Sequence, residues 1–157
     1  MTAPRLSLAS GFLALCLLLA PGFGTAIATS QEVAQAPASQ HQLADFAGHT
    51  GLRDVWAFVE MVTSLRASGR LPARFVTKDA ARARGWRGGG LCDVWPGHVI
   101  GGDTFHNFDL QLPAGQRYFE SDLDGDCEQR GPSRLVYSAE GLIFVTTDHY
   151  HTFARVP

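Results

Sequence analysis

Residues 118–150 read YFESDLDGDCEQRGPSRLVYSAEGLIFVTTDHY, and the fold class is predicted mainly from this segment. Its β-branched and aromatic runs are short and separated by turn residues, which is typical of consecutive antiparallel strands. The segment AEG at 139–141 predicts a tight hairpin between two of them. Together with the flanking residues, the pattern predicts five strands, near 98–104, 117–123, 134–138, 142–146 and 152–155.

The strand at 117–123 also predicts where a site would lie. Successive side chains of a strand point to opposite faces of the sheet. We therefore expect Phe119, Ser121 and Leu123 to enter the core. The alternate set, which faces a polar cleft, is Tyr118, Glu120 and Asp122.

The residues before this stretch have a helical pattern. Apolar residues recur at steps of three and four over 52–67, which predicts an amphipathic helix that Gly69 and Pro72 end. Thr77 can cap a second helix through 80–84, with Lys78 in its first turn. Residues 91–95 can add a further helical turn. Helices followed by an antiparallel meander predict an α+β fold, with the N-terminal helices packed on one face of a five-stranded antiparallel sheet.

The N-terminal part of the chain is typical of an exported protein. A basic region ends at Arg5, an apolar run follows over 12–20, and small residues precede a cleavage site after Ala28. A membrane anchor is the alternative, but this run is shorter than the roughly 20 residues that span a bilayer. We expect a signal peptide at 1–28, a flexible lead-in or propeptide at 29–45 and one domain at 46–157, secreted from the cell.

Charge and cysteine content limit what the mature domain can do. The whole chain has 13 basic and 15 acidic side chains, and removal of Arg5 with the signal leaves 12 basic and 15 acidic ones. The mature domain is therefore acidic, so binding to nucleic acid would need a local cationic site. Two cysteines, Cys92 and Cys127, remain after signal removal. In an oxidising compartment they predict one disulfide, and the lack of CxxC spacing disfavours the alternative, a metal site.

The C-terminal strands carry residue types that can cleave RNA without a metal or a protein nucleophile. RNA supplies its own nucleophile, the ribose 2′-hydroxyl, so the protein needs a base, an acid and cations for the phosphorane. Glu120 is the candidate base and His149 the candidate acid. The candidate cations are Lys78, Arg130 and Arg134. Taken singly, each of these residues would be an ordinary surface charge.

The acidic run at 122–128 raises the alternative of a calcium site. Gly125 precedes the third aspartate of the run, whereas in an EF-hand the glycine follows it. The closing glutamate of such a loop would fall at Ser133. The EF-hand pattern therefore fails, and we predict no metal and no cofactor.

The order of these motifs resembles the barnase-type secreted bacterial ribonucleases, which prefer guanine. The resemblance covers about 59–153 and rests on RLPARFVTKDAARARGW at 70–86, LCDVWPG at 91–97, IGGDTFHN at 100–107, YFESD at 118–122 and TTDHYHTF at 146–153. It implies Glu120 as general base, His149 as general acid, Arg130 and Arg134 as phosphate ligands, and Lys78 as support for the developing charge.

The resemblance also implies supporting and base-reading residues. Asp122 would hold the two arginines by ion pairing, Tyr150 would line the cleft, and Asp103 would be structural. The base-recognition loop would be Phe105, His106, Asn107, Phe108 and Asp109. The family has arginine and glutamate where this chain has Phe108 and Asp109, so the resemblance supports cleavage more strongly than guanine preference.

The sequence thus predicts a monomeric, metal-independent endoribonuclease that cleaves single-stranded RNA after guanosine through a 2′,3′-cyclic phosphate. Its activity should be bell-shaped in pH, between a carboxylate and an imidazole with reference pKa values of about 4.3 and 6.5. The family also implies a barstar-like intracellular inhibitor that presents acidic groups to the cationic cleft. The alternative function is a non-catalytic module on the same fold that binds RNA or a protein partner.

Overall fold

The computed structural model describes residues 38–125 and 127–157. The predicted signal peptide and the first part of the predicted lead-in lie outside the described residues. In chain order the elements are α1 (Gln40–His49), α2 (Val55–Ser68), β1 (Phe75–Val76), α3 (Lys78–Ala83), β2 (Val99–Phe105), β3 (Tyr118–Asp122), β4 (Arg134–Ser138), β5 (Ile143–Thr146) and β6 (Ala154–Arg155). Within the described part of the chain, none of the helices has the length and apolar character to cross a membrane.

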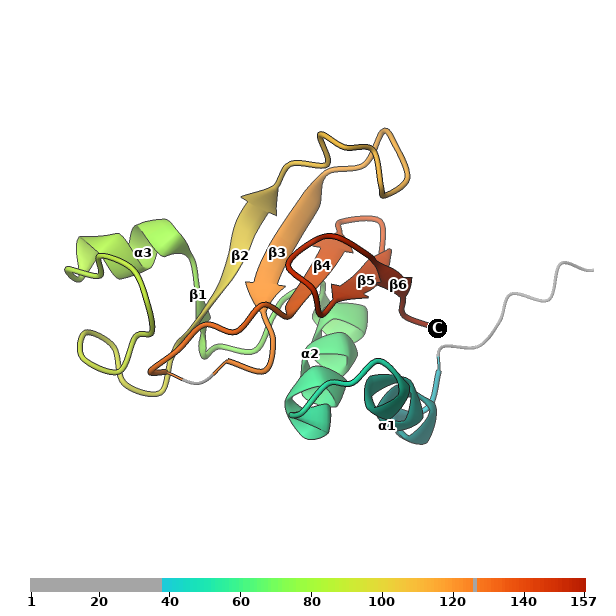
Figure 1. The fold of residues 1–157 in the computed structure, drawn as a ribbon, viewed down its shortest axis with the longest axis horizontal. Coiled ribbons are helices and arrows are strands. Elements are labelled where there is room, and N and C mark those ends of the chain that lie inside the picture. Colours follow the sequence, from blue (N-terminus) through green and yellow to red (C-terminus); the bar gives the residue numbers. More distant parts are fainter. Residues whose placement is uncertain (1–37, 126) are drawn as a thin grey trace, which may run out of the picture. The chain divides into compact units, whose positions relative to one another are not determined.

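The sheet has six strands in the order in which they occur along the chain, β1 to β6 (Figure 1). The five predicted strands are present as β2 to β6, with each boundary within two residues of the prediction. The α+β class is confirmed, and β2 to β6 form the predicted five-stranded antiparallel sheet, which has one strand more than expected. The additional strand β1 pairs in parallel with β2 through only Phe75 and Val76. Two residues are too short to produce a detectable alternation of apolar and polar positions.

Helix α1 corrects the predicted domain boundary. The flexible lead-in was predicted to reach residue 45, but α1 begins at Gln40, and Leu43 and Ala47 are buried in the main core. Ser39 caps this helix in a reciprocal pair with Gln42, with N–O distances of 2.7 and 3.3 Å. The helix buries only two residues, so it shows no sustained apolar period. The capping box was the available signal.

Helix α2 provides the centre of the main core. Asp54 caps its start by accepting the Ala57 N–H at 2.9 Å, and Gly69 ends it in the left-handed conformation at φ 69°. The predicted helix at 52–67 is therefore confirmed, although it begins at Val55 and not at residue 52. Its buried side chains pack with those of α1, β4 and β5 around Phe58, Val62, Leu135 and Val145. In Figure 1, α1 and α2 lie by β4 to β6, whereas α3 lies by β1 and β2.

Strand β3 is buried on both faces. Leu123, which follows it, belongs to the main core, and Ser121 is 1% exposed. On the other face Tyr118 packs with Leu112, Val136 and Phe144 in a smaller apolar cluster. The predicted alternation is therefore present for Ser121 and Leu123, whereas Phe119 is only half-buried and Tyr118 is a core residue rather than a cleft residue. Tyr118 differs from the prediction because this smaller apolar cluster covers its side chain.

A disulfide joins Cys92 to Cys127, as predicted, across 35 residues of sequence with a Cα–Cα distance of 4.7 Å. The same segments are hydrogen-bonded: Cys92 N donates to Cys127 O at 2.8 Å and Gly90 N donates to Glu128 O at 3.1 Å. A Cβ on Gly90 would lie 1.9 Å from the Cys127 carbonyl oxygen, so this close approach requires glycine. Residues 91–95 form a single turn there and do not continue as a helix. The β3–β4 loop is thereby fixed to the segment that follows α3.

Candidate active site

Glu120 lies at the centre of a cluster of polar side chains on β3. Only 9% of its surface is exposed. One carboxylate oxygen, Oε1, is 2.6 Å from Lys78 Nζ, and the other, Oε2, accepts a hydrogen bond of 2.6 Å from the Tyr150 hydroxyl. Burial and the bond to Glu120 raise the pKa of Tyr150 well above its ordinary value, so the hydroxyl remains a donor. The carboxylate is therefore fixed at both oxygens.

Lys78 is placed by the start of α3. Thr77 caps this helix by accepting the Ala80 N–H at 3.2 Å. The backbone N–H of Lys78 donates to both carboxylate oxygens of Asp103, at 3.1 and 3.0 Å. Asp103 lies opposite Glu120 in the β2–β3 register, so one lysine contacts two facing residues, one by its backbone and one by its side chain. Asp103 thus fixes the position of the lysine that contacts Glu120.

Asp122, two residues further along the same face, holds both predicted arginines. Arg130 binds it through two parallel bonds, Nε to Oδ2 at 2.6 Å and Nη2 to Oδ1 at 2.9 Å. Arg134 Nε lies 3.1 Å from Oδ1. The bonds to Asp122 raise the pKa of Arg130. Because two guanidinium groups share one buried carboxylate, this part of the site keeps a net positive charge.

The two arginines differ in how far their side chains are exposed to solvent. Arg134 is 5% exposed, and its Nη1 donates to the backbone carbonyls of Gly131 and Ser133 at 2.6 and 2.7 Å. Its Nε also donates to the Tyr150 hydroxyl at 3.1 Å. The Arg130 side chain is 22% exposed, with its guanidinium 5.8 Å from the centre of the Trp86 ring. Arg130 is therefore the more accessible cation for a phosphate.

His149 lies in the loop between β5 and β6, in a strained conformation. His149 and Tyr150 have φ values of 56° and 72°, in the left-handed region that costs roughly 1–2 kcal/mol per non-glycine residue. His149 is exposed, and its ring centre is 4.9 Å from that of Tyr150. Tyr150 thus lies between the candidate acid and the candidate base. Strain of this kind is typical of functional loops.

Asp148 holds this strained loop together. Its Oδ1 accepts the Thr146 hydroxyl at 2.8 Å and the N–H groups of His151 and Thr152 at 3.1 and 3.0 Å. Its Oδ2 accepts the Thr152 hydroxyl at 2.6 Å. The bonds from Thr152, then that from Thr146, hold the pKa of Asp148 far below its ordinary range. Asp148 was not among the predicted site residues. The signal for its role was an aspartate between two threonines, which favours local capping.

The predicted base-recognition loop divides into two parts. Phe105 belongs to the site, since its ring stacks on that of Tyr150 with centres 5.5 Å apart. Asn107 shapes the loop by donating to Leu112 O at 2.7 Å and accepting the Leu112 N–H at 3.1 Å. His106, Phe108 and Asp109 are exposed. These three side chains are thus open to solvent beside the cluster around Glu120.

Asp124, from the acidic run at 122–128, has a structural position. Its Oδ1 accepts the backbone N–H groups of Arg53 and Asp54, both at 2.9 Å. The Ser133 hydroxyl donates to its Oδ2 at 3.2 Å. Asp124 therefore fixes the β3–β4 loop to the start of α2, a role that the sequence analysis missed because the contact spans about 70 residues.

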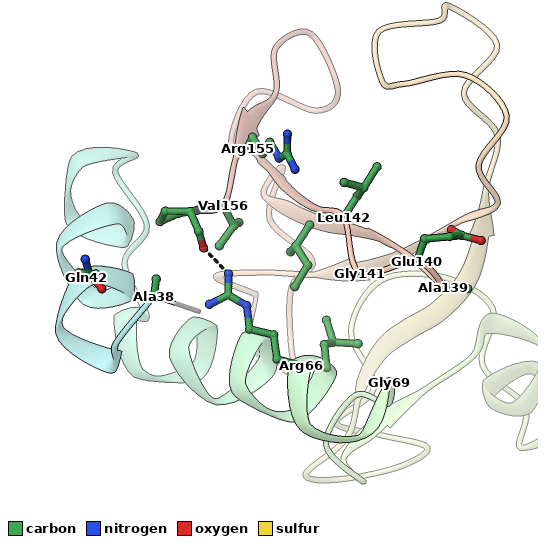
Figure 2. A pocket seen from close by; sticks show the side chains of 13 residues that line it. Ala38, Gln42, Arg66, Gly69, Ala139, Glu140, Gly141, Leu142, Arg155 and Val156 are labelled. Atoms are coloured by element: carbon green, nitrogen blue, oxygen red, sulfur yellow. Dashed lines mark hydrogen bonds between the residues drawn. The ribbon is translucent and has the colours of Figure 1, made fainter. Parts of the chain in front are cut away.

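A hollow of about 780 Å³ lies away from these residues, between the end of α2, the β4–β5 hairpin and residues 155–157. Figure 2 shows the Arg66 side chain crossing it, and the Arg66 guanidinium donates to the Pro157 carbonyl. Burial lowers the pKa of Arg66. Arg66 therefore has a structural role in this hollow. The candidate catalytic residues lie elsewhere, in the cluster around Glu120.

Comparison with known proteins identifies the family of this chain. A family model described as ribonuclease matches residues 60–157, which is more than half of the chain. The chain belongs to the ribonuclease family. This finding confirms the family predicted from the sequence, and the ribonuclease is accordingly an RNA-cleaving enzyme.

Individual relatives give the same result. The ribonuclease is 46% identical over 91 residues to a ribonuclease of Heyndrickxia coagulans, an alignment that spans 55% of this chain and 84% of the relative. Ribonucleases of Bacillus intermedius and Bacillus pumilus are each 45% identical over 91 residues. In these two cases the alignment spans 55% of this chain and 56% of the relative, a little more than half of their length.

Proposed function

We propose that this ribonuclease cleaves single-stranded RNA after guanosine, without a metal, by transesterification to a 2′,3′-cyclic phosphate and then hydrolysis. One observation carries the proposal. The Glu120 carboxylate is held between Lys78 and Tyr150, beside two arginines that share Asp122. A base and several cations on rigid strands are what a substrate with an internal nucleophile requires.

In the first step Glu120 takes the proton of the 2′-hydroxyl, whose oxygen then attacks the adjacent phosphorus. Lys78, Arg130 and Arg134 stabilise the negative charge of the phosphorane. His149 donates a proton to the departing 5′-oxygen, and the bond from that oxygen to phosphorus breaks. Its exposed ring suits an acid that exchanges protons with solvent.

In the second step the roles reverse. His149, now neutral, accepts a proton from a water molecule that attacks the cyclic phosphate. Glu120, now protonated, returns its proton to the 2′-oxygen as the ring opens. The hydroxyl of Tyr150 donates to the carboxylate in its charged form, which orients Glu120 for the first step.

The guanine preference rests on Phe105 and on the loop that follows it. The Phe105 ring is stacked on Tyr150 beside the Glu120 carboxylate, where a base could also stack. Asp109 is the carboxylate available to accept the guanine N–H groups. The two bonds from Asn107 to Leu112 hold the loop in one shape, which favours a fixed base orientation.

The experiment is cleavage of a short RNA that contains one each of GpN, ApN, CpN and UpN, in excess chelator. We expect cleavage after G, ending in a cyclic phosphate. His149→Ala and Glu120→Gln should each reduce the rate on the order of 10²–10⁴-fold. A requirement for added divalent metal would refute the mechanism. Equal cleavage after all four bases would refute the guanine preference but leave the mechanism intact.

We also propose that residues 1–28 direct secretion, and that the domain acts as a monomer once they are removed. The producing cell would then need protection, for which a barstar-like inhibitor with an acidic face would fit the positive charge beside Asp122. A pull-down of a co-encoded acidic protein by the His149→Ala variant tests this. Failure to retain such a protein would count against the inhibitor.

A further inference from the structure

The loop between β2 and β3 exposes apolar side chains next to the site. Within 38–125 and 127–157, three large apolar residues are exposed, namely Trp56, Phe108 and Leu110. Two of them lie in this loop, with 83% of Phe108 and 71% of Leu110 open to solvent. Large apolar groups gathered in this way commonly mark interaction sites.

The exposed rings are ordered relative to one another. The ring of His106 stacks on that of Phe108 with centres 5.1 Å apart and planes 11° apart. Phe108 N donates to His106 O at 2.9 Å and Leu110 N donates to Asn107 O at 3.2 Å. Leu110 has a φ of 52°, in the left-handed region. The loop therefore presents a fixed pair of parallel rings, which limits the entropy lost when a ligand binds.

Beside these rings lies a hollow of about 430 Å³, lined by residues 104–108, 110 and 113–118. This volume is within the range of about 300–1,000 Å³ that is typical of small-ligand sites. Arg117 is exposed and belongs to its lining, with its guanidinium 5.4 Å from the centre of the Phe119 ring. That ring lies with Leu65 and Tyr137 on the α2 side of the sheet, so the guanidinium points away from Glu120 and the hollow offers mainly flat apolar surface.

One residue, Phe105, belongs both to the lining of the hollow and to the surroundings of Glu120. Phe105 lines the hollow, and its ring also stacks on Tyr150, which binds Glu120. The remaining lining residues lie in the β2–β3 segment, outside the set that holds Glu120 and Asp122. A chain molecule bound at the cluster would therefore reach the hollow with a neighbouring unit.

We propose that this hollow is an accessory subsite for one nucleotide of single-stranded RNA beyond the guanosine at the cleavage position. The base stacks on the Phe108 ring, which His106 supports from behind. The proposal rests on the proposed function, in that RNA is the occupant. Stacking suits a chain whose net charge is −2, because it gives affinity without many phosphate contacts and tolerates any base.

The test uses fluorescent oligodeoxynucleotides, which lack the 2′-hydroxyl and are bound without cleavage. A dG-containing dinucleotide and a hexanucleotide with one dG are titrated with the enzyme by anisotropy. We expect the wild type to bind the hexanucleotide more tightly. Phe108→Ala should weaken hexanucleotide binding on the order of 10-fold and dinucleotide binding much less. Phe108→Tyr, which keeps the ring, should retain the affinity.

Two control variants complete the test. Arg117→Gln should leave hexanucleotide binding unchanged, because its guanidinium lies against Phe119 on the opposite face of β3 from Glu120. Trp56→Ala is the matched control, since it removes an exposed ring from α2, and it should leave hexanucleotide binding unchanged.

Any one of three results would overturn the subsite. The first is equal affinity of the wild type for the dinucleotide and the hexanucleotide, and the second is unchanged hexanucleotide binding by Phe108→Ala. The third is a loss of affinity in Phe108→Ala that is the same for both oligonucleotides. The third result would place the ring in the primary base site. Absence of RNA cleavage in the separate activity assay would refute the proposed function but would not alter these binding measurements.

Discussion

Replacement of both Cys92 and Cys127 by serine should lower the stability of the domain substantially. In the chain-entropy account, a crosslink that closes a loop of 35 residues restricts the unfolded chain by about 4 kcal/mol at 25 °C. Small domains are stable by only about 5–15 kcal/mol in total. We therefore expect the double variant to fold at room temperature, with a melting temperature lower by on the order of 15 °C.

Cleavage by the folded variant should fall only a few-fold. The β3–β4 loop that carries Arg130 is held by the disulfide, but also by the two bonds from Arg130 to Asp122 and by the bonds of Asp124 to Arg53 and Asp54. These contacts do not depend on the sulfur atoms. The stability effect should therefore be large and the catalytic effect small.

Urea unfolding of the wild type and of the double variant, each with and without a thiol-free reductant, measures the effect. Reductant should move the wild-type curve to that of the variant and leave the variant curve in place. A difference in unfolding free energy below about 1 kcal/mol would refute the entropic argument. A large loss of cleavage in the still-folded variant would show that the disulfide, rather than Asp122 and Asp124, positions Arg130.

Three other substitutions test the contacts of the site. Tyr150→Phe keeps the ring on Phe105 but removes the hydrogen bond to Glu120, so dinucleotide transesterification should slow by about 10-fold or more, and an unchanged rate would contradict the orienting role. Asp122→Asn leaves two guanidinium groups without their carboxylate and should cost about 3–5 kcal/mol in urea unfolding, whereas a neutral effect would mean that the arginines find other partners. The pKa of Asp148 is lowered in the folded state, so its charge stabilises the fold above the unfolded value of about 3.9, and this contribution is lost as pH falls through the folded value. The melting temperature of Asp148→Asn should therefore lie below that of the wild type at pH 7 and approach it below about pH 4, and an equal gap at pH 7 and pH 2 would contradict this linkage.

Local periodicity was sufficient to predict most of the fold. The apolar repeat over 52–67 predicted α2, Thr77 predicted the start of α3, and the alternation at 118–122 placed Glu120 and Asp122 on one face. These features depend on neighbours within a few residues. Helix α1 and strand β1 were missed because one buries only two side chains and the other has only two residues.

The geometry of the site depends on contacts between distant segments, which periodicity does not report. The Tyr150 hydroxyl reaches Glu120 across 30 residues because the chain turns through a left-handed conformation at His149 and Tyr150. Non-glycine residues rarely adopt this conformation, so the sequence gives no signal for it. The bond from Asp124 to the start of α2 is likewise invisible without the fold.

The Cys92–Cys127 bond has a consequence for how the domain withstands proteolysis. The exposed loop around Phe108 and Leu110 lies between these two cysteines in sequence, and exposed loop tips are the preferred sites of peptide-bond cleavage. A nick in this loop would leave both fragments covalently joined, with β2 still paired to β3. The cut enzyme would remain one molecule with Lys78 and Glu120 in contact across the nick, and only reduction would allow the fragments to separate.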